Sequence, residues 1–235
     1  MLNLTSRHVF YSSGLCFIFP HCFLNEALLL YKDPGITMEL IFATNNLHKL
    51  EEINDLLGER FQLKGLKDLD ISEEIPEDHE TLEENASQKA WYIYNKTGRS
   101  CFADDTGLEV DVLDGAPGVY SARYSRMGQI TFPEMEPAAG NIRKLLLEMD
   151  GKSNRTARFR TVIALLLDGV EFQFEGVVEG TITQSTSGTE GFGYDPVFRP
   201  DGYDKSFAEM NLALKNQISH RARAVQRLIE FLKGM

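Results

Sequence analysis

Cysteine is scarce in this sequence of 235 residues, which has three: Cys16, Cys22 and Cys101. Two of them lie within the first 37 residues, so the rest of the chain has one, and a disulfide framework is excluded there. A chain without structural disulfides is typical of a reducing compartment, and we therefore expect a cytoplasmic location.

Basic residues are also in deficit. Lysine and arginine number 24 against 35 acidic residues, which gives a formal net charge of −11. A surface this negative repels a phosphate backbone, so generic nucleic-acid binding is excluded. A small polyanionic ligand would instead need a local cluster of cations or a bound metal ion.

An uninterrupted apolar run long enough to span a membrane is missing as well. Between Arg7 and Glu26 no residue is formally charged, but a proline, two histidines and other polar residues interrupt the run. A spanning helix needs about 20 mostly apolar residues, and the basic start of a signal peptide is not convincing either. Because a clean strand pattern begins after Met38, we interpret residues 1–37 as an N-terminal extension upstream of the true start and residues 38–235 as one domain.

From Met38 onward, predicted strands alternate with predicted helices. The apolar runs and period-two patterns predict strands over 39–44, 61–66, 100–103, 108–113, 157–167 and 170–182. Apolar residues at helical spacing, together with Gly58 and Gly98 as stops and a capping box at Thr81 and Glu84, predict helices over 47–57, 81–96, 139–149 and from 219 to the end. Asp168-Gly169 marks a hairpin, which makes part of the sheet antiparallel, while the strand–helix units favour parallel pairing. We therefore predict an α/β fold with a mixed sheet.

The turn after the first predicted strand is a run of polar residues, Thr44-Asn45-Asn46-Leu47-His48-Lys49. Free backbone N–H groups and the positive end of a helix dipole bind anions at such a position, and Lys49 adds a charge one turn into the helix. The same residues fit an asparagine helix cap followed by a solvated lysine, so this segment alone leaves both interpretations open.

Two adjacent acids, Asp104 and Asp105, follow the apolar residues Phe102 and Ala103 directly. We expect them to end a short strand and to form a polar elbow before the strand that starts at Leu108. Unpaired carboxylates are costly in an apolar setting, and Mg²⁺ typically takes one or two protein carboxylates plus substrate phosphates. A polar turn capped by aspartates is the alternative, but the direct succession from buried residues favours a metal site.

Further polar candidates stand in the acidic loop over 72–78 and on the helix that follows it. Composition alone predicts that Glu77 lies in a solvated loop. Asn85 and Lys89 are four residues apart and therefore share one face of the predicted helix. Lys89 could reach a phosphate from that face, although a surface lysine is the commoner outcome.

The last third of the chain adds an aromatic ring and a group of cations. In the loop Gly191-Phe192-Gly193-Tyr194-Asp195-Pro196, Phe192 offers a stacking surface for a base and Asp195 an acceptor; a tight loop with a buried Phe192 is the alternative. Lys215, His220 and Arg221 place three potential cations around the start of the last helix. Because positive groups oppose the dipole at a helix N-terminus, this group favours an anionic or electron-rich ligand nearby.

Together and in this order, the motifs resemble the inosine triphosphate pyrophosphatase family, also called the non-canonical purine NTP pyrophosphatases. The resemblance covers the chain from Met38 to its end and does not cover residues 1–37. The matching residues are Ala43-Thr44-Asn45-Asn46 with Lys49, Glu84-Asn85-Ala86 with Lys89-Ala90, Ala103-Asp104-Asp105-Thr106-Gly107-Leu108, the segment 115–124, the segment 191–196, Lys215 and Ile218-Ser219-His220-Arg221. The stretch 126–137 matches no motif, and we assign it no role.

The resemblance implies an α/β fold with an elongated mixed β-sheet flanked by helices, two lobes and a central cleft. It implies an enzyme that hydrolyses ITP, dITP and XTP to the monophosphate and pyrophosphate, with Mg²⁺ as cofactor, and so removes these nucleotides from the pool. It also implies a homodimer, with neither nucleic acid nor a membrane as a partner.

The resemblance further assigns roles to individual residues. Asp105, Asp104 and Lys89 would be catalytic, with Asp105 and Glu77 as metal ligands, Asp105 as the proton acceptor and Asn85 in support. The triphosphate would be held by Thr44, Asn45, Asn46, Leu47, His48 and Lys49. The rest of the nucleotide would be held by Thr106, Phe192, Gly193, Tyr194, Asp195, Lys215, His220 and Arg221, with Phe192 against the base.

Two other functions fit parts of the pattern. A related pyrophosphatase could prefer a modified pyrimidine or a canonical dNTP, against which the cationic group around Lys215, His220 and Arg221 argues. A non-catalytic nucleotide sensor would not need the acids at Glu77, Asp104 and Asp105.

Overall fold

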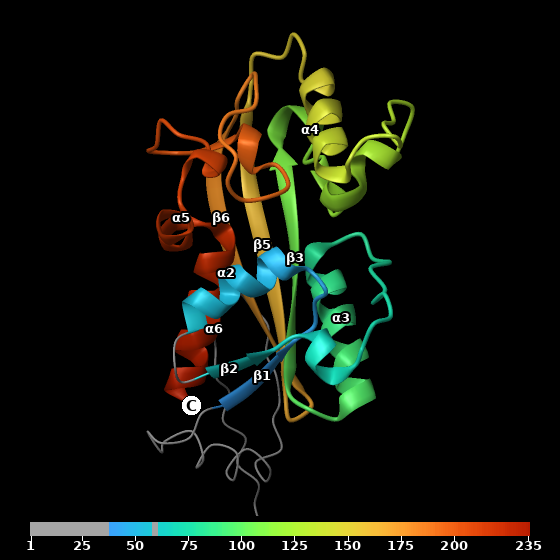
Figure 1. Ribbon diagram of the computed structural model, residues 1–235, viewed down its shortest axis with the longest axis vertical. Helices are drawn as coiled ribbons and strands as arrows, with labels where there is room; N and C mark the ends of the chain where they lie inside the picture. Colours follow the sequence, from blue (N-terminus) through green and yellow to red (C-terminus); the bar gives the residue numbers. More distant parts are fainter. Residues whose placement is uncertain (1–37, 58–60) are drawn as a thin grey trace, which may run out of the picture. The chain divides into compact units, whose positions relative to one another are not determined.

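A computed structural model describes residues 38–57 and 61–235 (Figure 1). The prediction that residues 1–37 are an extension, and the prediction that Gly58 ends the first helix, lie outside the described residues.

The described chain contains strands and helices at the positions that its hydrophobic pattern predicts. The strands are β1 (Met38–Phe42), β2 (Phe61–Lys64), β3 (Cys101–Val110), β4 (Pro117–Gly118), β5 (Thr156–Leu167), β6 (Val170–Ile182) and β7 (Phe198–Pro200). The α-helices are α2 (Leu47–Leu57), α3 (Leu82–Thr97), α4 (Pro137–Glu148), α5 (Leu212–Ile218) and α6 (His220–Gly234), with short 3₁₀ helices η1 to η5 at Leu66–Leu69, Asp111–Leu113, Ser121–Arg126, Asp195–Val197 and Phe207–Glu209. The sequence did not predict β4, β7 and α5. No helix in the described ranges is long and apolar enough to cross a membrane.

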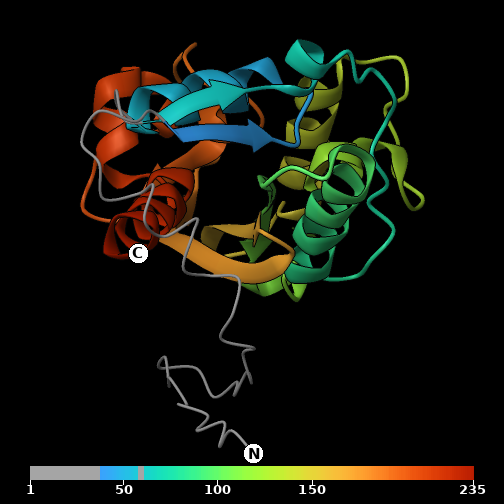
Figure 2. The same cartoon turned by 90° about the horizontal axis from the view of Figure 1, so that it is seen from below.

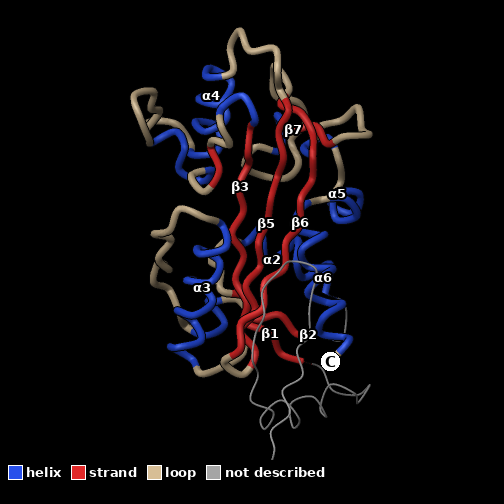
Figure 3. Tube along the Cα trace, turned by 180° about the vertical axis from the view of Figure 1, so that it is seen from behind, coloured by secondary structure: helices blue, strands red, loops and turns tan. Residues whose placement is uncertain are grey.

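All seven described strands belong to one mixed sheet, in the order β2-β1-β3-β5-β6-β7, with β4 paired to β3. β1 pairs in parallel with β2 and β3, whereas β3, β5, β6 and β7 pair antiparallel in sequence. The three longest strands, β3, β5 and β6, run side by side (Figure 3). The predicted mixed sheet flanked by helices is therefore confirmed.

Helices cover the sheet on both sides. α3 packs on β3 and β5, while α6 packs on β5 and β6 and also contacts α2; Figure 2 shows α3 in green and α6 in red on opposite sides of the strands. Among the hydrophobic clusters of the described residues, two flank the middle of β3. One surrounds Cys101, Ala103, Leu166 and the inner face of α3, and the other surrounds Val110 and the inner face of α4 at the far end of the same strands.

The aspartate pair lies between these two clusters, in the middle of β3. The sequence predicts two strands separated by a polar elbow, and that prediction is wrong: β3 is continuous, with Asp104 paired to Ile163 and Asp105 to Val162 of β5. Side chains alternate along a strand, so Asp104 faces α2 and α6, whereas Asp105 faces α3. The strand tolerates two buried acids because cations on those helices compensate each of them.

Local signals at turns and caps predicted the structure well. Thr81 caps α3 by accepting a hydrogen bond from the backbone N–H of Glu84 at 3.2 Å, and Gly98 ends that helix at φ 66°. Asp168 and Gly169 join β5 to β6 with φ values of 50° and 81°. Positive φ at both central residues is the signature of a type I′ hairpin turn.

The packing of α6 on β6 depends on one glycine. A Cβ atom at Gly176 would lie 2.0 Å from the carbonyl oxygen of His220 and 2.5 Å from the backbone nitrogen of Ala224. We expect Gly176→Ala to lower the free energy of unfolding by roughly 1–3 kcal/mol or more, because the backbone of α6 must move away. Urea unfolding measures this loss, and Gly234→Ala, at a position with open space around it, is the control. Equal stability of the two variants would contradict the tight packing.

Candidate active site

One pocket, with a volume of about 510 Å³, gathers residues from across the described chain. It is lined by members of both hydrophobic clusters, including Ala43 on one side and Phe159 on the other. Of the site residues that the sequence suggests, the pocket brings together Thr44, Asn45, Asn46, His48, Lys49, Glu77, Lys89, Asp105, Thr106, Phe192, Gly193, Tyr194, Asp195, Lys215, His220 and Arg221. Leu47 and Asp104 do not line it. The side chain of Leu47 points outward and is 54% exposed, and Asp104 is buried beneath the pocket wall.

The turn between β1 and α2 forms one wall of the pocket. The Asn46 side-chain oxygen accepts hydrogen bonds from the backbone N–H groups of His48 at 3.0 Å and Lys49 at 3.3 Å, so Asn46 is the helix cap. Within the described residues, the backbone N–H groups of Asn45 and Leu47 have no partner. The helix cap and an anion site are therefore compatible: capping uses some N–H groups and leaves others free.

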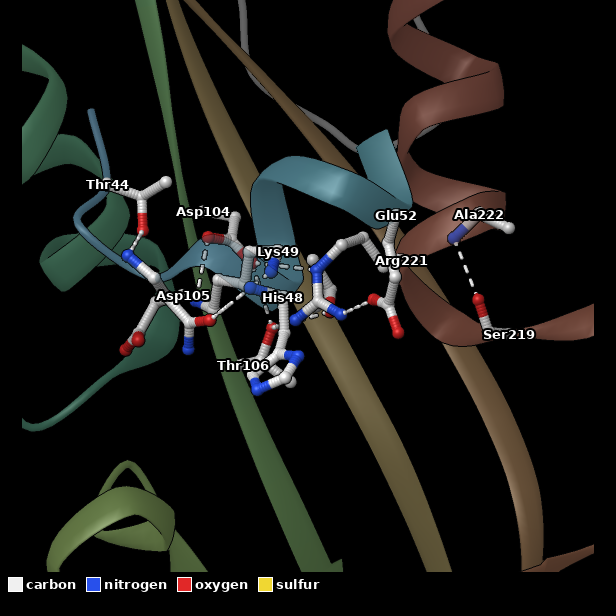
Figure 4. A network of polar contacts seen from close by, with 12 residues as sticks. Thr44, His48, Lys49, Glu52, Asp104, Asp105, Thr106, Ser219, Arg221 and Ala222 are labelled. Atoms are coloured by element: carbon white, nitrogen blue, oxygen red, sulfur yellow. Dashed lines mark hydrogen bonds and ion pairs between the residues drawn. The ribbon is translucent and has the colours of Figure 1, made fainter. Parts of the chain in front are cut away.

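Asp104 anchors a buried ionic network behind that wall (Figure 4). Its carboxylate accepts from Lys49 Nζ at 2.7 Å and from Arg221 Nε at 3.3 Å, and Thr106 Oγ1 donates to it at 3.2 Å. Burial alone would raise the pKa of Asp104, but the charges of Lys49 and Arg221 hold that pKa well below its usual range. Asp104 is thus ionised, and it pairs with two cations behind the pocket wall.

Glu52 of α2 is the central residue of this network that the sequence did not suggest. It is buried and binds Lys215 Nζ at 2.7 Å through one oxygen and Arg221 Nη1 through the other. Burial opposes its ionisation, yet Arg221 and Lys215 lower its pKa. Its one sequence signal is spacing: Glu52 stands three residues after Lys49 and therefore shares a helix face with it.

Phe192 and its loop form the wall next to Lys215. The Phe192 ring stacks on the His48 ring at 5.3 Å, with Lys215 Nζ 5.0 Å from its centre. Asp195 is buried, and its carboxylate accepts from Lys215 Nζ at 2.6 Å and from the backbone N–H of Phe192 at 2.8 Å. Tyr194 is also buried and donates its hydroxyl hydrogen to a backbone carbonyl. Phe192 is therefore half-buried and presented to the pocket, while the two residues after Gly193 hold the loop in place.

Asp105 faces the opposite side of the sheet from Asp104, toward α3. Lys89 Nζ lies 3.3 Å from Asp105 Oδ1 and 2.5 Å from Glu77 Oε1, so one lysine joins both acids. Asn85, one turn before Lys89, exchanges hydrogen bonds with the backbone of His79 and thereby fixes the loop that contains Glu77. Burial raises the pKa of Asp105 despite the charge of Lys89, and Glu77 adds to the rise.

The carboxylates around Lys89 fit a divalent metal ion. Asp105 Oδ2 is buried and has no hydrogen-bond partner within the described residues, which leaves one hard oxygen available beside Glu77. Within residues 38–57 and 61–235, no three acidic, histidine or cysteine side chains form a complete metal cage. A site with two carboxylates suits Mg²⁺, which usually completes its shell with water and substrate phosphates.

His220 is not a cation, which corrects the expectation of a positive group at the start of α6. Its ring is buried and stacks on Phe159 at 4.5 Å, and burial together with the charges of Arg221 and Lys215 puts its pKa well below the usual value for histidine. Lys215 and Arg221 are cations, and they form ion pairs with the carboxylates of Glu52, Asp104 and Asp195. Carboxylates therefore compensate the charges of Lys215 and Arg221, so these two residues do not by themselves indicate an anionic ligand at the start of α6.

The low pKa of His220 predicts a loss of stability in mild acid. Below about pH 6.5 the unfolded chain takes up a proton on this histidine and the folded protein does not, so the free energy of unfolding falls as the pH falls. Between pH 8 and pH 5 we expect this loss to be up to about 2 kcal/mol larger in the wild type than in His220→Gln, which does not titrate. Urea unfolding at both pH values measures the difference, and identical pH dependence in the two proteins would contradict it.

The amino-acid sequence of the chain is similar to those of known proteins. The family model of the Ham1 family matches residues 40–231. A dITP/XTP pyrophosphatase of Porphyromonas gingivalis is 51% identical over 195 residues, covering 83% of this chain and 97% of that protein, and one of Flavobacterium johnsoniae is 48% identical over 195 residues, covering 83% and 98%.

The fold of the chain is similar to those of solved Ham1 proteins. The Staphylococcus aureus Ham1 protein is 36% identical, with a TM-score of 0.72 over 83% of this chain and 98% of that one. A HAM1 protein from Coxiella burnetii is 34% identical, with a TM-score of 0.74 over 85% and 100%. The resemblance inferred from the motifs is confirmed, and the chain belongs to the Ham1 family.

Proposed function

We propose that this protein hydrolyses non-canonical purine nucleoside triphosphates, ITP, dITP and XTP, to the monophosphate and pyrophosphate. The main supporting observation is that one pocket combines a helix start with free N–H groups, a carboxylate pair joined by a lysine, and the half-buried ring of Phe192. Two relatives that are 48% and 51% identical to it over 195 residues are named dITP/XTP pyrophosphatases. The enzyme thereby removes these nucleotides from the pool.

At the phosphate end, we propose that the segment Thr44–Lys49 binds the triphosphate through backbone N–H groups and the Lys49 ammonium. Leu47 contributes its backbone only, because its side chain points away from the pocket. Lys89 holds Glu77 and Asp105 in place and adds positive charge near the scissile bond. Asp104 lies behind the pocket wall and holds the side chains of Lys49 and Arg221 in position through ion pairs.

Asp105 is the proposed centre of the chemistry. Together with Glu77 it would hold Mg²⁺, and its carboxylate would accept a hydrogen bond from the attacking water and so orient that water in line with the leaving pyrophosphate. When bound, the cation neutralises the charge that develops on phosphate oxygens. The unpartnered Asp105 Oδ2 supports this role, since a buried carboxylate oxygen without a partner is costly unless a ligand uses it.

At the base end, we propose that the purine stacks on Phe192 and that its 6-oxo oxygen accepts hydrogen bonds from Lys215, His220 and Arg221. Thr106, Gly193, Tyr194 and Asp195 complete this wall. Adenine presents an amino group at the same position and would leave buried donors unpaired. A site built around such donors can discriminate by about 10⁴-fold. Homodimer formation and a cytoplasmic location stay predictions.

Product analysis tests the proposed reaction. Incubation with ITP and Mg²⁺ should release pyrophosphate and IMP in equal amounts, with no inosine diphosphate, and chelation with EDTA should stop it. Release of inorganic phosphate and inosine diphosphate would show cleavage at the wrong bond. Binding of ITP without any cleavage would favour a nucleotide sensor instead.

A further inference from the structure

Arg123 stands at the edge of the pocket and has no role in the site described above. It belongs to η3, whose residues Ser121 and Ala122 line the pocket. Its guanidinium Nη1 lies 3.7 Å from Glu77 Oε2, and Glu77 lines the pocket as well. Arg123 therefore reaches from η3 to the acidic loop beside the proposed metal site.

The backbone that presents Arg123 is held firmly by two buried polar residues of α4. Asn141 accepts from the backbone N–H of Ser125 at 2.7 Å and donates to the carbonyl oxygens of Ser121 and Ala122 at 3.0 and 3.1 Å. Lys144 donates from Nζ to two further carbonyl oxygens at the end of η3. A helix that is fixed at both ends can place a side chain with little loss of conformational freedom on binding.

The other lysine and arginine side chains of the pocket already form ion pairs with carboxylates. Each lysine or arginine that lines the pocket is paired with a buried or half-buried carboxylate: Lys49 with Asp104, Lys89 with Glu77 and Asp105, Lys215 with Glu52 and Asp195, and Arg221 with Glu52 and Asp104. Separating a buried pair leaves an uncompensated charge and is far more costly than separating an exposed one. A triphosphate nevertheless brings several negative charges into this pocket.

The ion pair between Arg123 and Glu77 is longer and more exposed than those pairs. Separating it therefore costs less free energy than separating any of them. The side chains of Arg123 and Glu77 are 37% and 34% exposed, and the guanidinium also lies over the Tyr120 ring, 5.2 Å from its centre. Guanidinium groups form strong paired hydrogen bonds with phosphate oxygens.

We propose that Arg123 binds the β- and γ-phosphates of the substrate, exchanging its contact with Glu77 for the anionic end of the triphosphate. This inference rests on the proposed function and adds a phosphate-binding residue from η3 to the segment Thr44–Lys49. Arg123 is thereby a binding residue for the leaving pyrophosphate, and it has no part in choosing the base.

Equilibrium binding in EDTA, without divalent metal, tests the proposal by calorimetric titration of ITP and of IMP. Arg123→Ala should weaken ITP binding about tenfold, as expected for one charge-assisted hydrogen bond, and should leave IMP binding unchanged because IMP lacks the β- and γ-phosphates. Arg123→Lys should restore part of the affinity. Arg126→Ala, which removes an exposed charge one turn along the same helix, should bind ITP as the wild type does.

Repeating Arg123→Ala in a Glu77→Gln background separates phosphate binding from an effect through Glu77. If Arg123 binds phosphate, the tenfold loss of ITP affinity persists in that background. The proposal is overturned if the loss disappears there, if Arg123→Ala binds ITP like the wild type, or if it weakens IMP equally. Failure of the wild type to cleave ITP would instead overturn the proposed function, whatever Arg123 does.

Discussion

Asp105→Asn should lower the turnover of ITP by about 10²-fold or more at saturating Mg²⁺, the size of effect seen when a group that stabilises transition-state charge is lost. The substitution keeps the shape of the side chain and removes its negative charge. Steady-state pyrophosphate release measures the loss. Asp111→Asn, which neutralises an exposed carboxylate just beyond the end of β3, should retain wild-type turnover.

The same variant should be at least as stable as the wild type at neutral pH without added metal. Because the pKa of Asp105 is raised in the folded protein, its ionised form is disfavoured by folding, and a neutral amide removes that penalty. Lost activity with retained or increased stability would separate a functional role from misfolding. Wild-type turnover in Asp105→Asn would remove Asp105 from the proposed chemistry, and a large loss of stability would make it structural.

Arg221→Ala should lower the free energy of unfolding by about 3–5 kcal/mol, because it leaves buried carboxylates without their shared cation. Arg221 is 1% exposed and contacts Glu52, Asp104 and Thr106. Urea unfolding measures the loss. Arg158→Ala is the matched control, since Arg158 pairs with Glu109 where both side chains are partly exposed, and an ion pair open to solvent is worth about 1 kcal/mol.

A second substitution shows whether the loss comes from charge or from packing. Glu52→Gln removes one of the carboxylates that Arg221 compensates, so the double variant should be about 1–3 kcal/mol more stable than the sum of the two single effects predicts. Strict additivity would mean that the ion pair between Arg221 and Glu52 does not stabilise the protein.

Patterns that depend on nearby residues were predictable from the sequence. The Thr81 cap, the Asp168-Gly169 hairpin and the inward face of α6 each follow from a few neighbouring positions, and all three are present. The Asn46 cap was one of two interpretations of its segment, and the structure contains it.

Features that depend on distant partners were not predictable. The polar elbow was inferred because two acids inside an apolar strand are costly. β3 remains continuous because Lys49 and Arg221, 55 and 117 residues away from Asp104, neutralise that residue, and because Lys89 does the same for Asp105 from another helix. Glu52 was missed for the same reason, since its partners Lys215 and Arg221 lie more than 160 residues further along the chain.

The most direct test of the account is the ratio of kcat/KM for ITP to that for ATP in the wild-type protein, measured by pyrophosphate release at saturating Mg²⁺. XTP, dITP, GTP and CTP complete the panel. Because donors at Lys215, His220 and Arg221 suit a 6-oxo purine, we predict that ITP, dITP and XTP exceed ATP and CTP by up to about 10⁴-fold. Turnover of ATP or CTP at the rate of ITP would contradict the account and assign the pocket to a different nucleotide.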